Sequence, residues 1–230
     1  MERAAIDRRG STPLHVAAKK GDLETCKLYA ENGFNMSPAD NYGATPLHVA
    51  AREGHTNLVE ALIRLGADPD IRDAQGRTAV FHACLAGKAS TLQAMISRMG
   101  FSIDSRGILS SSLLHAAAFA GKVSCIERLV ECGAYVSATD KDDLTPLHIA
   151  AERGHLDCCR RLVSFGAPVN ALSQTERQTP LSSALINGHA EIAEFLSCEG
   201  GLLPEELLMV AELIAKKKRK RHFFFPIASS

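Results

Sequence analysis

Three residue markers recur along this chain of 230 residues at intervals of 33 or 34 residues, and this period constrains the fold more than any other feature. A threonine or serine comes first, a glycine follows it nine residues later, and a second glycine keeps the same phase. The three sets are Thr12, Thr45, Thr78, Ser112, Thr145 and Thr179; Gly21, Gly54, Gly87, Gly121, Gly154 and Gly188; and Gly33, Gly66, Gly100, Gly133, Gly166 and Gly200. Such a period indicates small units that bury their apolar faces against one another.

Each marker also predicts a local conformation. Four of the six units begin with Thr-Pro, as at Thr45-Pro46, which is typical of a capping hydroxyl followed by proline at the first helical position. The next glycine ends this helix after about two turns, a length that is unstable alone. Apolar residues at helical spacing then predict a second helix, and turns at 40–43 and 73–76 that carry Asp and Gly predict a projecting hairpin.

The heptapeptides at 45–51 and 145–151 resemble the signature of the ankyrin-repeat family, since they read Thr-Pro-Leu-His-Val-Ala-Ala and Thr-Pro-Leu-His-Ile-Ala-Ala. The resemblance covers roughly residues 7–203 and implies an all-α solenoid of stacked antiparallel helix pairs with projecting β-hairpin turns. It also implies a concave face made of hairpins and first helices, and no enzyme activity. Repeats three and four depart most from the pattern, with Ala79-Val80-Phe81 and Ser112-Leu113 at their helix starts. We expect local softness or specialised contacts there.

The domain organisation follows from the extent of the repeat pattern. We assign residues 1–203 to a domain of about six repeats, 204–221 to a capping helix with a basic end, and 222–230 to a flexible tail. Pro204 suits the first position of the capping helix, and Glu205 and Glu206 suit the positive end of its dipole. Its apolar stripe is Leu207, Leu208, Ala211, Ile214 and Ala215, which we expect to cover repeat six.

The formal net charge is zero, but six consecutive basic residues stand near the end of the chain. They are Lys216, Lys217, Lys218, Arg219, Lys220 and Arg221. Without them the chain has 20 basic residues against 26 acidic ones, which argues against nucleic-acid binding by the repeat body. The run itself has three readings: a nuclear-import signal, a contact with anionic lipid or RNA, and a solvated helix end.

No residue pattern points to catalysis, a cofactor, a metal or a small-molecule substrate. Seven of the nine histidines share two repeat positions, which favours structural roles. The seven cysteines include no Cys-x-x-Cys pair, as expected of reduced thiols in an intracellular protein. No apolar stretch approaches the ~20 residues of a membrane span. We therefore expect a monomer in the cytoplasm, the nucleus or both.

Partner-binding residues are assigned from the exposed positions that the resemblance implies, the hairpin turns and the end of each first helix. These candidates are Tyr42, Arg52, Arg77, Leu85, Ile108, Leu109, Phe119, Leu144, Glu152 and Arg153. Around them the N-terminal repeats are polar with a positive bias, whereas repeats three and four present leucine, isoleucine and phenylalanine. The apolar centre is either a binding patch for a partner segment or part of the local core. Asn170 resembles asparagines that are hydroxylated in the family, although it also suits the turn.

These observations favour a non-enzymatic interaction module, an adaptor, scaffold or regulator that binds another protein on its concave face. The rival interpretation is a nuclear regulator of transcription or chromatin whose basic tail directs import or touches nucleic acid. An enzyme is the third class.

Overall fold

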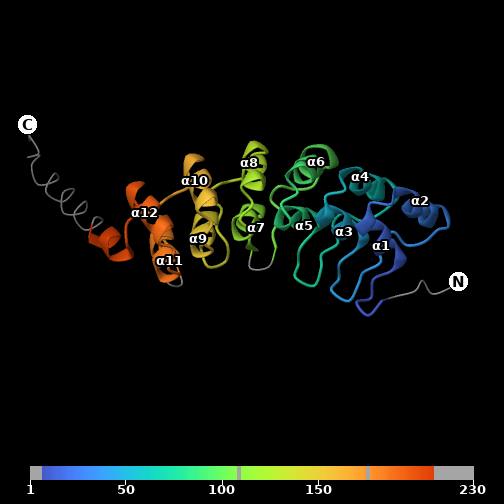
Figure 1. Ribbon diagram of the computed structural model, residues 1–230, viewed down its shortest axis with the longest axis horizontal. Coiled ribbons are helices and arrows are strands. Elements are labelled where there is room, and N and C mark those ends of the chain that lie inside the picture. Colours follow the sequence, from blue (N-terminus) through green and yellow to red (C-terminus); the bar gives the residue numbers. More distant parts are fainter. Residues whose placement is uncertain (1–6, 108–109, 175–176, 210–230) are drawn as a thin grey trace, which may run out of the picture.

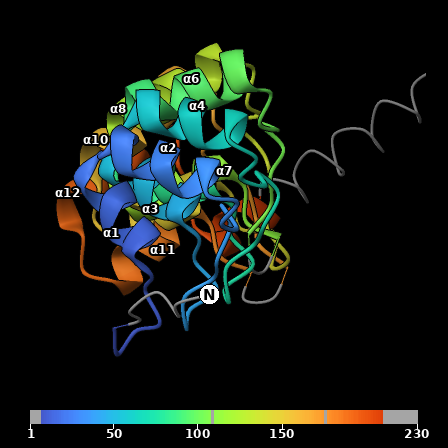
Figure 2. The same ribbon diagram turned by 90° about the vertical axis from the view of Figure 1, so that its right-hand side faces the viewer.

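The computed structural model describes residues 7–107, 110–174 and 177–209, and within these, helices α1 to α12 form six antiparallel pairs. The helices are α1 (Pro13–Lys20), α2 (Leu23–Glu31), α3 (Pro46–Glu53), α4 (Thr56–Arg64), α5 (Ala79–Leu85), α6 (Ala89–Met99), α7 (Leu113–Phe119), α8 (Val123–Glu131), α9 (Pro146–Glu152), α10 (Leu156–Ser164), α11 (Pro180–Ile186) and α12 (Ala190–Cys198). Odd-numbered helices form an inner row and even-numbered helices an outer row of an elongated stack (Figure 1). Seen along the stack, the units lie one behind another (Figure 2).

The inner helices begin where the sequence predicts. The cap residue at each start is extended, as at Thr45 with φ −102° and ψ 168°, and in five of the six starts a capping box joins it to the third helical residue. The glycine after each inner helix has positive φ, as at Gly54 with φ 88°. A helix of seven or eight residues is thereby fixed at both ends and depends on its neighbours for stability.

A single apolar core runs the length of the stack. It extends from Leu14 in α1 to Leu196 in α12, and leucine recurs in it at the second position of α1, α3, α7, α9 and α11. Alanine or cysteine fills the positions where an inner helix approaches the next unit, as at Ala51 and Cys84, which are fully buried. Small side chains there allow helices to pack closely. The predicted all-α solenoid is confirmed.

The turns between units project beyond the inner helices, and we call them fingers: finger one is residues 7–11, finger two 40–44 and finger three 73–77 (Figure 1). Each is closed by a backbone bond across its base, such as Asp40 N to Ala44 O at 2.9 Å. Adjacent fingers are joined by bonds from Asn41 N to Arg9 O and from Ala74 N to Tyr42 O. Among the described residues the only bridge of β type is the isolated pair Arg106 and Ser112, so the predicted hairpins are tight turns without extended strands.

At the end of the stack, residues 204–209 are helical, with Leu207 partly buried and Leu208 half exposed. The rest of the predicted capping helix, including Ala211, Ile214 and Ala215, and the tail at 222–230 lie outside the described residues. None of the described helices combines the length and apolar character needed to cross a bilayer.

Candidate partner-binding groove

A groove of about 800 Å³ lies on the inner side of repeats one to three, between the fingers and the exposed faces of α1 and α3. Its walls carry the aliphatic side chains of Val16 and Val49 and the phenol ring of Tyr42. Its charged lining is dominated by cations, namely Arg9, Lys19, Lys20, Arg52 and Arg77. We call this site the N-terminal groove.

Aspartate at the base of each finger holds the turn that shapes the groove. Asp40 Oδ1 accepts from the backbone N–H groups of Tyr42 and Ala44, both at 2.9 Å. Asp7 Oδ1 does the same for Arg9 and Ser11, both at 2.8 Å. The finger therefore presents Tyr42 to solvent on a fixed backbone, and 62% of its surface is exposed.

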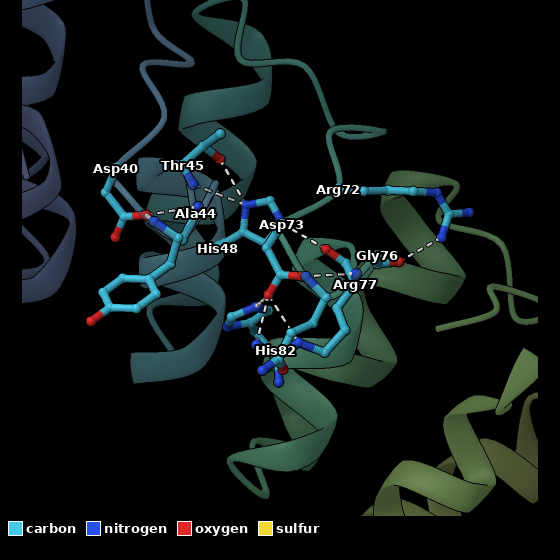
Figure 3. A network of polar contacts seen from close by, with 11 residues as sticks. Asp40, Ala44, Thr45, His48, Arg72, Asp73, Gly76, Arg77 and His82 are labelled. Carbon is cyan, nitrogen blue, oxygen red and sulfur yellow. Dashed lines mark hydrogen bonds and ion pairs between the residues drawn. The ribbon is translucent and has the colours of Figure 1, made fainter. Parts of the chain in front are cut away.

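Asp73 in finger three makes a larger network (Figure 3). Its Oδ1 accepts from the N–H groups of Gln75 and Arg77, and its Oδ2 accepts from the Arg77 guanidinium at 2.7 and 2.9 Å and from His82 Nε2 at 2.8 Å. Burial opposes ionisation of Asp73, but these hydrogen bonds outweigh it and lower its pKa to about 2. Burial lowers the pKa of His82 to about 4 despite the bond to Asp73.

Histidines on the inner helices link each unit to the next. His48 Nδ1 accepts from the Thr45 amide at 3.1 Å, and because a carbonyl only accepts, its Nε2 donates to Arg77 O at 3.0 Å. Equivalent rings bond to the next unit at His15, His115 and His148. A second set of histidines donates back to carbonyls on the inner helix of the previous repeat. These are His55, His155 and His189. These seven histidines thus hold the repeats together.

Repeat three lacks this link because Phe81 stands where the other units have histidine or serine. Thr78 Oγ1 is left buried with no hydrogen-bond partner in the described residues. His82, one position later, turns instead to Asp73 and packs edge-on against the ring of His48 at 4.9 Å. The sequence signal for this network is a histidine shifted by one residue in a unit with a normal Asp-Gly finger; the pattern predicted the turn at Asp73 but not its contact with His82.

The predicted binding residues divide between two places. Tyr42, Arg52 and Arg77 all line the N-terminal groove. Val16 also lines the groove and is 47% exposed, but the sequence did not single it out because its repeat position is apolar in most units. The positive bias predicted for the N-terminal repeats corresponds to Arg9, Lys19 and Lys20, which line the groove together with Tyr42.

The apolar centre predicted over repeats three and four is only partly open. Leu85 packs against the core, and Leu144 is half-buried beside the bond from His115 to its carbonyl. Phe119 is 48% exposed, and the Arg153 guanidinium lies 4.1 Å from the centre of its ring, a cation–π contact. Arg153 also pairs with Glu152 at 3.5 Å. Ile108 and Leu109 lie outside the described residues, as do Lys216 to Arg221.

Asn170 is exposed, and both ends of its amide are engaged. Its Nδ2 donates to Gly200 O at 2.9 Å, and its Oδ1 accepts from Leu202 N at 2.8 Å. The side chain thus ties the turn after α10 to the segment that follows α12. This geometry gives Asn170 a structural role, and its hydroxylation stays a prediction.

Burial suppresses the ionisation of three cysteine thiols on the outer helices α2 and α10. Burial raises the pKa of Cys26 and Cys158 to about 11 and that of Cys159 to about 12, which keeps these thiols protonated and unreactive. Among the described residues no three His, Cys, Asp or Glu side chains are grouped to hold a metal ion.

The fold and the groove define a helical-repeat protein with a ridged inner face. A family model described as ankyrin repeats in three copies matches residues 2–73, 57–140 and 113–202, and the chain belongs to the ankyrin-repeat family, whose domains are generally protein-protein interaction modules. The chain is similar to the solved ankyrin repeat domain of Bcl-3, described as a unique member of the IkappaB protein family, with 28% identity, a TM-score of 0.70, and 85% of this chain and 89% of that one covered. It is also similar to the human ASB11 ankyrin repeat domain, with 27% identity, a TM-score of 0.72, and 84% and 85% covered. The search of curated proteins finds no match.

Proposed function

We propose that this chain is a non-enzymatic adaptor, scaffold or regulator that binds a partner protein on its concave face, in the cytoplasm, the nucleus or both. The observation that carries the proposal is the N-terminal groove, where fingers held by aspartates present Tyr42 beside exposed cations. Exposed aromatic and arginine side chains on a rigid frame are the residues most often responsible for affinity in protein interfaces. The monomeric chain supplies this whole surface by itself.

The test compares two double variants in quantitative affinity purification. Tyr42→Ala with Arg52→Glu alters the groove, whereas Tyr135→Ala with Arg98→Glu makes the same chemical changes at exposed positions outside its lining. We expect a set of proteins that the control retains and the groove variant loses, with equal thermal unfolding of the two. Identical sets for both variants would contradict binding in the groove.

The apolar centre is a second candidate surface. Phe119→Glu places a carboxylate within reach of Arg153, so the folded chain should tolerate it. Partners that this variant loses and the groove variant keeps would assign them to repeats three and four. Loss of thermal stability in place of partners would assign Phe119 to local packing.

The rival function, a nuclear regulator with a basic tail, is favoured by Lys216 to Arg221. Replacement of all six by alanine in a fluorescently tagged chain tests it by localisation. An unchanged distribution contradicts an import role.

Hydroxylation of Asn170 stays a proposal as well. It predicts one added oxygen atom in the intact mass of protein isolated from cells and no addition in Asn170→Ala. An unmodified mass excludes it.

A further inference from the structure

We propose that the N-terminal groove binds an extended, acidic peptide segment of a partner, with apolar side chains placed between the carboxylates. This inference rests on the proposed function and adds the chemistry of the ligand. It comes from the way in which charge is distributed over the residues of the groove.

Each acidic side chain of the groove uses at least one carboxylate oxygen to hold its own finger. Asp7, Asp40 and Asp73 each accept two backbone N–H groups of their own finger, and Asp73 also accepts from Arg77 and His82. One oxygen of Asp7 and of Asp40, and both oxygens of Asp73, are thus committed to contacts within the protein. They are poorly placed to attract a cationic ligand.

Of the five cations that line the groove, Arg77 is paired with Asp73, whereas the other four are available. Within the described part of the chain, no carboxylate lies at ion-pair distance from the exposed side chains of Arg9, Lys19 and Lys20. Arg52 reaches only the neighbouring Glu53, at 3.3 Å, and keeps half of its side-chain surface exposed. Unpaired cations gathered on one concave wall attract carboxylates through a field that solvent screens less than on a flat surface.

This excess of cations is confined to one end of the solenoid. At the matching positions of repeat five, Lys141 pairs with Asp142 at 3.6 Å and Arg153 pairs with Glu152 at 3.5 Å. Repeat six has Ile186 and Asn187 at the end of α11. The remainder of the chain before Lys216 is acidic overall, so the N-terminal groove is a positive site on a negative body. An acidic segment is therefore steered to it and repelled elsewhere.

The apolar surface in the groove sets the second requirement. Val16 is 47% exposed and Tyr42 62% exposed, and both line the same cavity as Lys19 and Lys20. A ligand made only of carboxylates would leave these surfaces in water. Three inner helices at ~8–10 Å spacing place the first and third axes ~16–20 Å apart, a distance that an extended peptide of ~5–6 residues covers.

The test uses a fluorescein-labelled nonapeptide that repeats glutamate, glutamate and leucine three times, with fluorescence anisotropy as the readout. Two controls replace every glutamate by glutamine or by lysine. We expect binding of the glutamate peptide alone, weakening as salt is raised from 50 to 300 mM because the attraction is screened. Equal binding of the glutamine peptide overturns the proposal.

Matched variants locate the site. Lys19→Gln with Lys20→Gln removes two groove charges, and Lys27→Gln with Lys141→Gln removes two lysine charges outside the groove lining. We expect the first pair to weaken binding about tenfold and the second less than twofold. Equal effects of both pairs, or equally tight binding of a nine-nucleotide single-stranded DNA, would show a general anion surface and overturn the assignment.

The two proposals fail separately. If the peptide does not bind but the Tyr42 and Arg52 variant still loses protein partners, the acidic ligand is wrong and the interaction module stands. If no partner depends on the groove, the proposed concave site fails first.

Discussion

Two aspartates at equivalent finger positions, Asp40 and Asp73, carry very different numbers of hydrogen bonds. Asp40 uses one oxygen for two backbone N–H groups, while both oxygens of Asp73 are engaged and its side chain is 3% exposed. Asparagine retains the oxygen that closes the turn but replaces the second oxygen by an N–H donor.

We therefore predict that Asp73→Asn lowers the free energy of unfolding by about 2 kcal/mol, because the Arg77 guanidinium loses its charged partner. Asp40→Asn should cost less than about 0.5 kcal/mol. Urea unfolding of both variants measures the difference. Equal losses would mean that the second oxygen of Asp73 contributes nothing.

The histidines that link repeats predict how stability depends on pH. Burial lowers the pKa of His148 from 6.5 to about 4, with His82 lowered similarly. Between these values the unfolded chain binds more protons than the folded one, so stability falls as pH is lowered through this window. For His148 alone the expected loss between pH 7 and pH 5 is roughly 2 kcal/mol.

His148→Gln removes this titration and should reduce the pH dependence of stability by that amount. Chemical denaturation of both proteins at pH 5, 6 and 7 is the measurement. Parallel profiles for wild type and variant would show that His148 is not the group that titrates.

At the scale of the elements, the fingers stack closely enough to restrict their glycines. Gly43 has φ 73°, and a Cβ there would lie 2.9 Å from the backbone nitrogen of Ala74 in the next finger. Gly33 has a matching φ of 71° with nothing within 4 Å of an added Cβ. Substitutions at the two positions therefore separate the free-energy cost of the backbone conformation from the cost of the steric contact.

We predict that Gly33→Ala costs about 1 kcal/mol, the price of positive φ alone, and that Gly43→Ala costs more because the second and third fingers must separate. Thermal unfolding compares them. A smaller loss for Gly43→Ala would show that the fingers move apart without cost.

The junction of repeats three and four shows how one element departs from the others. Phe81 has no ring nitrogen to reach repeat four, and it packs where Gly107 leaves space, since an added Cβ at Gly107 would lie 3.0 Å from its ring. An apolar contact thus replaces the hydrogen bond found at the junctions that have histidine there. The buried, unpartnered hydroxyl of Thr78 is a consequence of that exchange.

At the scale of the whole molecule, no helix pair follows repeat six within the residues that the structure describes. Leu185 is 51% exposed, whereas the equivalent residues of the other repeats are buried. These residues are Ala18, Ala51, Cys84, Ala118 and Ala151. The position is thus a core position everywhere except at the end of the stack.

Leu185→Gln should therefore change the free energy of unfolding by less than about 0.5 kcal/mol. The same residue in repeat five, Ala151→Gln, should cost more than about 2 kcal/mol, because it forces an amide into a fully packed contact. Urea unfolding of both variants measures the two changes in the free energy of unfolding. A large loss for Leu185→Gln would show that another part of the chain covers this end.

The sequence by itself determined the repeat, the helix boundaries and the shared histidine positions. These features depend on local rules that the chain repeats: a capping hydroxyl and a glycine with positive φ at a fixed spacing in all six units, and a proline after the hydroxyl in four of them. Tyr42, Arg52 and Arg77 could be assigned to the inner face because each occupies a repeated, exposed position.

Only the tertiary structure decided which of these residues act together. Arg77 is bound to Asp73, and Phe119 is covered by the Arg153 guanidinium. The local sequence rules that set the helix boundaries do not predict these side-chain contacts. The same holds for Lys19 and Tyr42, which share the groove although they come from different repeats. Repeat period fixes the backbone because it is encoded locally, whereas charge pairing and burial arise between units once they are stacked.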